Sequence, residues 1–188
     1  MKKWNELTWA SFAISDVADI LSGQDIYDQE RKKGNYPYIT ATSEQNGIGY
    51  FVGNMNCTYE SNCLSVNRNG SVGYAFFHPY FALFGNDTRK LIPKNKSKYV
   101  GFFLARCITE QRYKYGYGLK MGTGRLMRQK IMLPINDKTG EPDYEFMDEY
   151  MRQIEQKLLE KYKTYISKEK DNNDKYGGVK SKDGNLTL

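Results

Sequence analysis

The sequence lacks any long apolar run. None of its apolar stretches approaches the roughly 20 residues that a membrane-spanning helix needs. The first residues, MKKWNELTWASF, contain no apolar signal core. These absences exclude a membrane span within the sequence and predict a cytoplasmic protein without a membrane partner.

Cysteine and histidine are scarce: the chain has Cys57, Cys63, Cys107 and a single histidine, His78. An odd number of cysteines in a cytoplasmic setting indicates reduced, buried thiols rather than disulfides. A structural zinc site needs four suitably spaced ligands, and these residues do not have that spacing. His78 also lacks a recognisable Ser/His/Asp or Cys/His pattern. We therefore expect no metal, no cofactor and no catalytic residue.

Motifs for phosphate, methyl-donor and nuclease chemistry are missing or incomplete. Gly116–Gly124 does not match Gly-x4-Gly-Lys-Ser/Thr. Asn35–Tyr38 superficially resembles the Asn/Asp-Pro-Pro-Tyr motif of amino-methyltransferases, but no Gly-rich cofactor loop precedes it. Asp143, Glu155 and Lys157 have nuclease-like spacing, yet a helix would hold them about three turns apart, too far to converge on one metal. A non-catalytic binding protein is expected, and an enzyme with an unrecognised site is the alternative.

Acidic residues are absent from residues 112–130, RYKYGYGLKMGTGRLMRQK. Residues 89–130 together carry 12 basic and 1 acidic side chains, whereas residues 1–88 carry 6 and 9, and residues 131–188 carry 10 and 12. Cations neutralise phosphates, aromatic rings stack, and glycines allow close backbone approach. The segment predicts a nucleic-acid surface; binding of another polyanion, or a charge excess that only aids solubility, is the alternative.

The 16 Tyr and 9 Phe residues favour a strand-rich fold over a helical bundle. Asn46-Gly47 and Asn69-Gly70 are turn signals between apolar runs. Short strands are expected at residues 36–42, 50–52, 63–66, 74–77 and 81–84. The strand meander is typical of an all-β or α+β domain, and together with the helices described next we expect the α+β class.

Helical signals are fewer. Residues 15–21 predict a short helix after a Ser15 cap, and residues 99–111 have apolar side chains at helical spacing. The glycines that follow predict a loop to Gly124 and a turn at residues 125–128. Residues 131–135 predict a closing strand that ends near Pro134.

Residues 143–166, DYEFMDEYMRQIEQKLLEKYKTYI, predict one helix of about 24 residues, or roughly 36 Å. Its apolar residues follow a heptad ladder interrupted by Lys161, and so wide an apolar face needs a partner. Residues 167–188 are polar and predict a disordered tail. The partner of the apolar face would be the chain's own domain, a second copy or another protein. For a second copy, dimerisation is expected through Met147, Tyr150, Met151, Ile154, Leu158, Tyr162 and Tyr165.

Short motifs occur in a fixed order along the chain. They are Ile20-x2-Gly23, GNYPYITAT at residues 34–42, Asn46-Gly47-Ile48, NRNGSVG at residues 67–73, YKYGYG at residues 113–118, Arg125-Leu126, and Leu133-Pro134 before the long helix. In this order and spacing they resemble the target recognition domain of the DNA specificity (S) subunit of type I restriction-modification systems. The resemblance covers about residues 6–166.

The resemblance implies a fold and a role. Residues 1–140 would form a globular target recognition domain of short, mostly antiparallel strands with a few helices, followed by one long C-terminal helix at residues 143–166. The domain would read one half of a split target in double-stranded DNA. The helix would act as a spacer that docks the modification (methyltransferase) subunits, and through them the restriction subunit. The specificity component itself would catalyse neither DNA methylation nor DNA cleavage.

The family's usual chain has two recognition domains and two helices, whereas this sequence has one of each. We therefore expect a half-subunit that forms a homodimer through residues 143–166 and reads a repeated half-site. The alternative is a non-catalytic interaction module or regulator that binds modification subunits without reading DNA.

Candidate DNA contacts come from residue chemistry rather than from the family. Phosphate or guanine contacts are expected from Arg112, Lys114, Lys120, Arg125, Arg128 and Lys130. Tyr115 and Tyr117 would either touch DNA or pack into the domain. Base-edge contacts are expected from turn residues Gln45, Asn46, Arg68 and Asn69. An Asn-Gly pair also suits a turn that needs positive φ, so Asn46 and Asn69 have a structural alternative.

Overall fold

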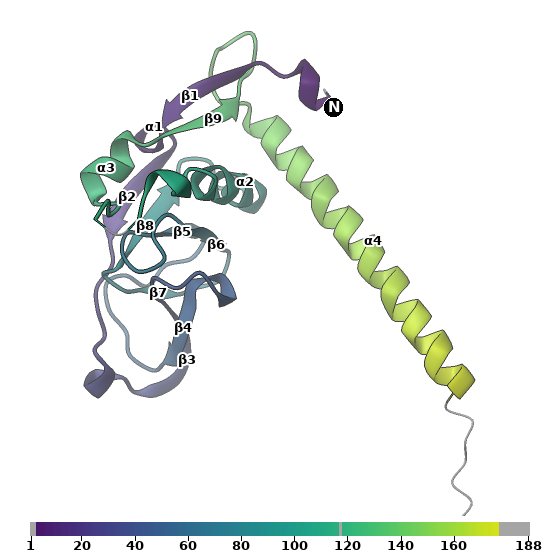
Figure 1. Ribbon diagram of the computed structural model, residues 1–188, viewed down its shortest axis with the longest axis horizontal. Helices are drawn as coiled ribbons and strands as arrows, with labels where there is room; N and C mark the ends of the chain where they lie inside the picture. The colour runs from purple at the N-terminus through teal and green to yellow at the C-terminus, as the bar shows by residue number, and fades with distance from the viewer. Residues whose placement is uncertain (1–2, 117, 177–188) are drawn as a thin grey trace, which may run out of the picture. The chain divides into compact units, whose positions relative to one another are not determined.

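The computed structural model describes residues 3–116 and 118–176, with side chains through residue 169 (Figure 1). Its strands are β1 (Trp9–Ala13), β2 (Ala18–Ser22), β3 (Lys33–Ile39), β4 (Ile48–Val52), β5 (Cys63–Asn67), β6 (Ala75–His78), β7 (Leu83–Phe84), β8 (Thr88–Pro93) and β9 (Lys130–Pro134). Its α-helices are α1 (Ile14–Val17), α2 (Lys98–Thr109), α3 (Thr123–Arg128) and α4 (Tyr144–Tyr176). Short 3-10 turns are η1 (Trp4–Glu6), η2 (Asp28–Glu30), η3 (Gln45–Gly47) and η4 (Arg112–Lys114).

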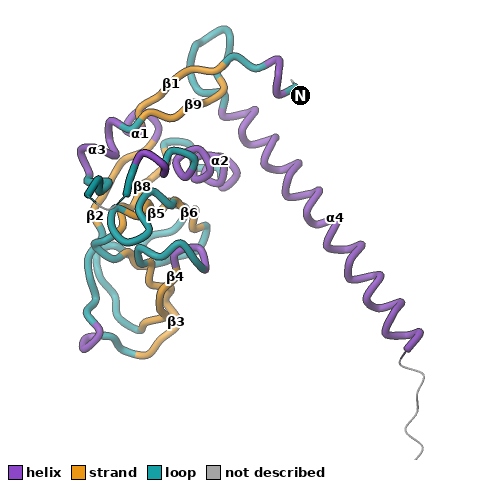
Figure 2. Tube along the Cα trace, in the orientation of Figure 1, coloured by secondary structure: helices purple, strands orange, loops and turns teal. Residues whose placement is uncertain are grey.

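The strands form three sheets, and the expected α+β class is confirmed. An antiparallel four-stranded sheet has the order β2-β8-β5-β6, and a three-stranded sheet has the order β4-β3-β7 with β7 parallel to β3. The third sheet is the antiparallel pair β1-β9 (Figures 1 and 2). None of the described helices is long and apolar enough to cross a bilayer.

One face of the four-stranded sheet is apolar and packs under α2. Alternate residues of β5 and β6, such as Leu64 and Phe77, point to this face because side chains alternate along a strand. The Ser97 hydroxyl caps α2 by accepting a hydrogen bond from the Tyr99 amide, 3.1 Å away. At Gly101 an added Cβ would lie 2.3 Å from the Phe77 ring, so the helix approaches the sheet closely. This is the main core of the domain.

The other face of the same sheet is polar although it is buried. Ser65, His78 and Lys90 point to it and are almost fully buried. The Ser65 hydroxyl lies 2.8 Å from His78 Nε2, and Lys90 Nζ donates to the Thr58 carbonyl at 3.2 Å. The three-stranded sheet covers this layer, since Phe84 of β7 packs edge-on against the His78 ring. Hydrogen bonding offsets the cost of burying these groups.

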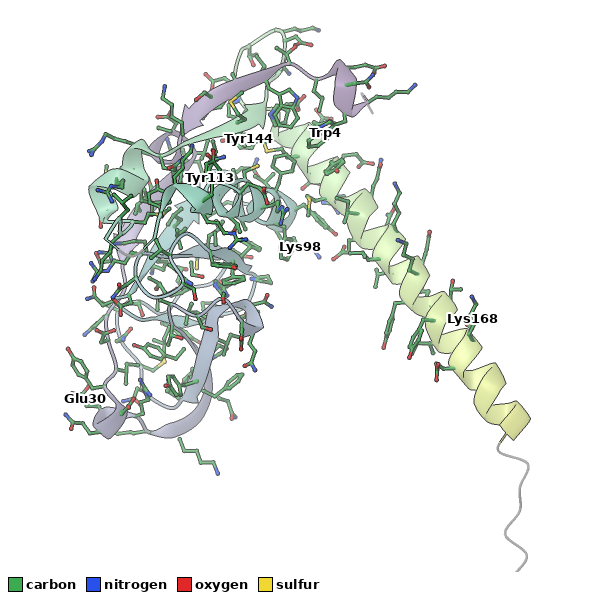
Figure 3. The ribbon with its side chains drawn as sticks, viewed as in Figure 1. Trp4, Glu30, Lys98, Tyr113, Tyr144 and Lys168 are labelled. Atoms are coloured by element: carbon green, nitrogen blue, oxygen red, sulfur yellow. The ribbon has the colours of Figure 1, made fainter. Side chains whose placement is uncertain are left out.

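Aromatic packing surrounds the first turns of α4. Trp4 lies 5.1 Å from the Tyr150 ring centroid, and Tyr150 stacks on Phe146. Figure 3 shows Trp4 next to the beginning of this helix. The Asp143 carboxylate accepts a hydrogen bond from the Phe146 amide and so caps the helix. The N-terminal segment and the first turns of α4 therefore share one aromatic cluster.

The long helix is longer than expected. It begins at Tyr144 and ends at Tyr176, so the first ten residues of the expected tail, 167–176, are helical. Residues 177–188 lie outside the described residues. The chain divides into two compact units between Met151 and Arg152, and α4 begins in the first unit and continues in the second.

Two local expectations are wrong, and one strand was missed. The expected helix at residues 15–21 is limited to α1, and β2 takes its second half. The expected turn at residues 125–128 belongs to α3, which begins at Thr123 despite Gly124. Strand β8 was not expected at all because Arg89 and Lys90 resemble surface residues; both are buried in the four-stranded sheet.

Candidate nucleic-acid interface

Connections between strands gather at one edge of the two larger sheets. Strands β3, β5 and β7 end there, while β4, β6 and β8 begin there. Asn67 Nδ2 donates to the Thr42 carbonyl at 2.8 Å, and the Ser71 amide donates to the Ala41 carbonyl at 3.1 Å. The β3–β4 and β5–β6 connections are therefore joined. We call the joined set the loop rim: residues 40–47, 67–74, 85–87, 110–116 and 118–122.

Arg68 ties three parts of the loop rim together. Its Nε donates to the Asn86 carbonyl at 2.9 Å, and its amide donates to the Asp87 carbonyl at 3.0 Å. Its own carbonyl accepts from the Met121 amide at 3.3 Å. Asn69 Nδ2 donates to the Asp87 carboxylate at 3.2 Å. Arg68, expected to contact DNA, thus has a structural role that the sequence did not reveal, and Asn69 makes an intramolecular contact as well.

Arg89 is a buried residue that hydrogen-bonds the loop rim. It is only 6% exposed, and its Nε donates to Thr123 Oγ1 at 2.7 Å at the beginning of α3. Its Nη1 donates to the carbonyls of Asn86 and Thr88 at 3.0 and 2.9 Å. Burial lowers the pKa of the Arg89 guanidinium, and the nearby Arg68 charge acts in the same direction. One buried guanidinium therefore links the β7–β8 turn to the basic helix α3.

The expected cations after α2 are exposed. Arg112 Nη1 donates to the Tyr74 hydroxyl at 2.9 Å, and its guanidinium lies 4.8 Å from the Tyr74 ring centroid. Arg125 Nη1 donates to the Lys120 carbonyl at 2.6 Å, which ties α3 to the loop before it. Exposed cations on η4, the following loop, α3 and the first residue of β9 are Arg112, Lys114, Lys120, Arg125, Arg128 and Lys130.

The two expected aromatic contacts have different outcomes. Tyr115 is half-buried against the main core, and its hydroxyl donates to the side-chain oxygen of the buried Gln129. Burial raises the pKa of the Tyr115 hydroxyl. Packing is therefore the alternative that the structure supports for Tyr115. Tyr117 lies outside the described residues.

The charge excess of residues 89–130 is not one continuous surface, which corrects the interpretation from sequence. Arg89 and Lys90 are buried. Lys94 donates a hydrogen bond to the Asp16 carbonyl at 2.8 Å. It lies just before the first residue of α2, whereas the cations of residues 112–130 follow the last residue of that helix. The 12 residues of α2 span about 18 Å between the beginning of the helix and the cations after it; Figure 3 labels Lys98 and Tyr113 near the two ends. The exposed cations near the loop rim are those of residues 112–130.

Gln45 and Asn46 lie at the tip of the β3–β4 connection and are exposed. Their φ angles are 48° and 54°, in the left-handed region. Positive φ was expected at Asn46 because Asn precedes Gly there, but Gln45 carried no such signal. Asn69 does not adopt positive φ, whereas Gly70 does, with φ of 57°.

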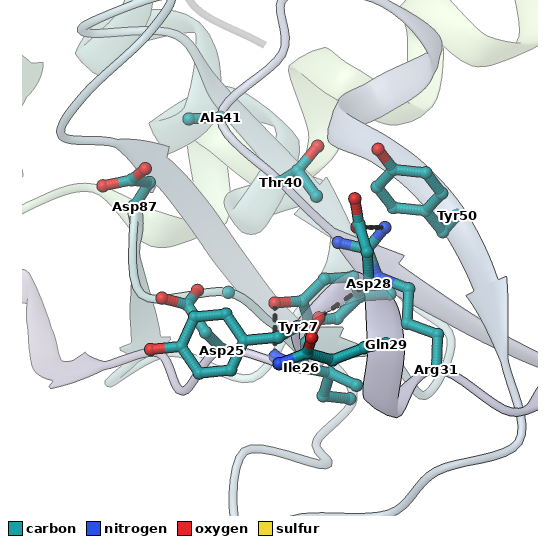
Figure 4. A pocket seen from close by; sticks show the side chains of 12 residues that line it. Asp25, Ile26, Tyr27, Asp28, Gln29, Arg31, Thr40, Ala41, Tyr50 and Asp87 are labelled. Carbon is teal, nitrogen blue, oxygen red and sulfur yellow. Dashed lines mark hydrogen bonds and ion pairs between the residues drawn. The ribbon is translucent and has the colours of Figure 1, made fainter.

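A hollow of about 560 Å³ opens beside the loop rim (Figure 4). The Arg31 guanidinium lies 3.8 Å from the Tyr50 ring centroid and forms an ion pair with Asp28. Carboxylates of Asp25, Asp28 and Asp87 line the hollow. Because these carboxylates outnumber the single Arg31 cation of its lining, the hollow is unsuited to phosphate.

The Ser65 and His78 side chains are close together but buried. Ser65 and His78 form a Ser-His pair, with Tyr80 3.2 Å from His78 Nδ1, but Ser65 and His78 have no exposed surface. Burial lowers the pKa of His78 to about 4. Burial also raises the pKa of the Cys63 and Cys107 thiols to about 12. Among the described residues no group of three or more His, Cys, Asp or Glu side chains is placed to hold a metal ion.

Comparison with known proteins identifies the family. Residues 6–164 match the type I restriction modification DNA specificity domain family. The chain is 38% identical over 161 residues to the specificity subunit S.BcgI of a type II restriction enzyme from Heyndrickxia coagulans, covering 85% of this chain and 47% of that protein. The chain therefore spans about half the length of this curated relative.

Solved structures share the fold. The S subunit of a type I restriction-modification system from M. genitalium superposes with a TM-score of 0.67 at 16% identity, covering 94% of this chain and 46% of that one. The HsdS subunit from Thermoanaerobacter tengcongensis gives a TM-score of 0.54 at 14% identity, covering 83% and 39%. With the family match over most of its length, this chain belongs to the type I restriction-modification DNA specificity domain family.

Proposed function

We propose that this chain reads one half-site in double-stranded DNA with the loop rim and the exposed cations of residues 112–130. The observation that supports this most directly is the joining of four connections, remote in sequence, into one rim that carries exposed cations and exposed amides. Phosphate contacts position a protein on a duplex, and contacts with base edges give specificity. Both kinds of donor are present here, and family membership agrees with the assignment.

The roles divide by chemistry. Arg112, Lys114 and Arg125, with the other exposed cations of residues 112–130, neutralise phosphates and supply most of the affinity. Gln45 and Asn46 contact base edges. Arg68 and Asn69 hold the loop rim in shape, and Tyr115 packs beneath it.

We propose that two copies pair through the later part of α4 into a homodimer, because the exposed apolar side chains there need a partner. Leu158, Tyr162 and Tyr165 are 59, 61 and 58% exposed, and with Ile154 they continue one apolar stripe. Met147 is fully buried in the domain's own core, and Tyr150 and Met151 pack against that core. The dimer surface therefore begins after Met151. The same helix would dock modification subunits, and through them the restriction subunit, while this chain itself catalyses neither reaction.

A charge-reversal pair tests DNA binding. Lys114→Glu with Arg125→Glu should weaken binding to all duplexes and flatten the dependence of affinity on salt, because fewer counterions are released. The matched control is Lys32→Glu with Lys33→Glu, which makes the same charge change at the exposed opposite end of β3, away from the loop rim. Equal loss in both double variants, or no loss in the first, would contradict the assignment.

Light scattering tests pairing. The wild-type protein should have twice the 21.8 kDa chain mass, and Leu158→Glu with Tyr162→Glu should return it to one chain mass by placing charges in the apolar stripe. A wild-type mass of one chain at high protein concentration would contradict the proposed homodimer.

A further inference from the structure

Three consecutive residues at the tip of the β3–β4 connection adopt left-handed backbone. The φ angles are 48° at Gln45, 54° at Asn46 and 78° at Gly47. Glycine adopts this region freely, but a side chain with Cβ meets the following carbonyl there, and Gln is not among the residue types that tolerate it best. The turn is therefore strained at Gln45, whereas Asn46 is of a residue type that tolerates positive φ.

The surrounding structure holds this turn in place. The Thr40 amide donates to the Gly47 carbonyl at 2.8 Å, and the Gly47 amide donates to the Glu44 carbonyl at 2.8 Å. Gly47 is buried, and a Cβ added there would lie 3.2 Å from the Phe76 ring. Strain that persists because neighbouring contacts enforce it is typical of functional sites.

The strained turn presents two free amides. Gln45 and Asn46 are exposed, and their side-chain amides have no hydrogen-bond partner among residues 3–116 and 118–176. The turn belongs to the loop rim through Thr42 and Ala41, which accept hydrogen bonds from the β5–β6 connection. The strain thus serves no hydrogen bond of these side chains within the described residues, and the two adjacent exposed residues are accessible to a ligand.

The charge around the turn favours a base over a phosphate. Residues 40–49, TATSEQNGIG, contain Glu44 and no Lys or Arg. A carboxylate beside the two amides repels phosphate but tolerates a base edge that carries an amino group. An Asn or Gln amide matches adenine in the major groove, where it accepts from N6 and donates to N7.

We propose, on the basis of the proposed DNA-reading function, that Gln45 and Asn46 read adenine in the half-site and that the left-handed turn is retained for this purpose. The cations of residues 112–130 supply affinity without choosing the sequence, whereas this pair supplies a base preference. Relief of the strain and loss of that preference therefore go together in the same substitution.

Glycine substitutions separate stability from specificity. Gln45→Gly should raise the Tm by about 2–4 °C, because glycine removes the Cβ clash. Asn46→Gly should change the Tm little, because Asn already tolerates positive φ. Asn62→Gly is the matched control: Asn62 is also exposed with φ of 51°, but it lies at the opposite end of β5 from the loop rim. Like Asn46→Gly, Asn62→Gly should change the Tm little, and it should leave DNA selection unchanged.

Selection of bound sequences from random duplex DNA, with full-length protein, supplies the second measurement. The wild-type protein should enrich a half-site containing adenine, and Gln45→Gly with Asn46→Gly should lose about tenfold or more of the preference at that position. Affinity for non-specific duplex should change less than threefold. Asn46→Asp, which replaces the donor by an acceptor, should also lose the adenine preference.

The outcomes distinguish this inference from the function on which it rests. If the wild-type protein enriches a sequence and the glycine variants keep it with equal preference, the assignment of Gln45 and Asn46 is overturned while DNA reading stands. If the wild-type protein enriches no sequence, both are overturned. If the adenine preference is lost together with all non-specific binding, the pair contributes affinity rather than base choice, and the inference is also overturned.

Discussion

The single histidine should make the stability of this protein depend on pH between about 5 and 7. His78 is fully buried between the two larger sheets, and burial lowers its pKa from 6.5 to about 4. The folded state therefore binds fewer protons than the unfolded state throughout this range. The contribution of the neutral ring is fully present above pH 6.5 and is lost as pH falls toward 4.

The expected magnitude follows from the two pKa values. Lowering the pH from about 7 to about 5 should remove about 2 kcal/mol of unfolding free energy, and the full loss approaches about 3 kcal/mol below the folded pKa. Carboxylates also titrate near the lower end of the range. His78→Gln keeps a polar side chain beside Ser65. This variant should lose the part of the pH dependence of the unfolding free energy that comes from histidine, and it should retain the part that comes from carboxylates.

Two measurements check this reasoning. Urea unfolding of the wild-type protein and of His78→Gln at several pH values should give a difference in free energy that shrinks as the pH falls. Because the chain has one histidine, its imidazole NMR signals can be assigned without mutation and should not titrate near 6.5. Titration of the folded protein with a pKa close to 6.5, or a wild-type stability equal at pH 5 and 7, would refute the argument.

Two further predictions concern packing and thiol chemistry. Gly101→Ala should lower the unfolding free energy by about 1–3 kcal/mol in denaturant titrations, because the new methyl group would overlap the Phe77 ring; Gly124→Ala, with only a flexible side-chain tip at 3.6 Å, should not destabilise the protein. Brief alkylation of the native protein near neutral pH, followed by mass spectrometry, should modify exposed Cys57 first, since burial raises the pKa of the other two thiols to about 12. Uniform modification of all three cysteines would contradict this.

Local patterns in the sequence predicted most elements of the first domain. The helical spacing that begins at Val100 gave α2, and the apolar ladder of residues 143–166 gave about the first two thirds of α4. The Asn46-Gly47 pair predicted positive φ correctly. Each of these signals depends on residues within one or two turns of each other, so a single sequence contains them completely.

Contacts between distant residues were not predictable in the same way. Strand β8 was missed because Arg and Lys are usually surface residues. In the fold, Arg89 is buried with a hydrogen bond to Thr123 and Lys90 with one to Thr58, both remote in sequence. The same limit affected the candidate interface: the net charge located the exposed cations after α2, but it counted the buried ones equally. The strain at Gln45 arises from contacts that fix the whole turn. Its residue type therefore did not predict a positive φ.

The pairing of β1 with β9 brings together the first and last strands of the domain. Trp9 lies opposite Pro134 and Ala13 opposite Lys130, so the loop rim and both larger sheets are formed by the chain between the two strands. A genetic crossover outside this pair transfers the complete domain. A crossover between the two strands joins two parts from different proteins that must pack into one core, and strand edges from one parent must pair with those from the other. Exchange of the whole segment from β1 to β9 is therefore the replacement of the loop rim that disturbs the domain core least.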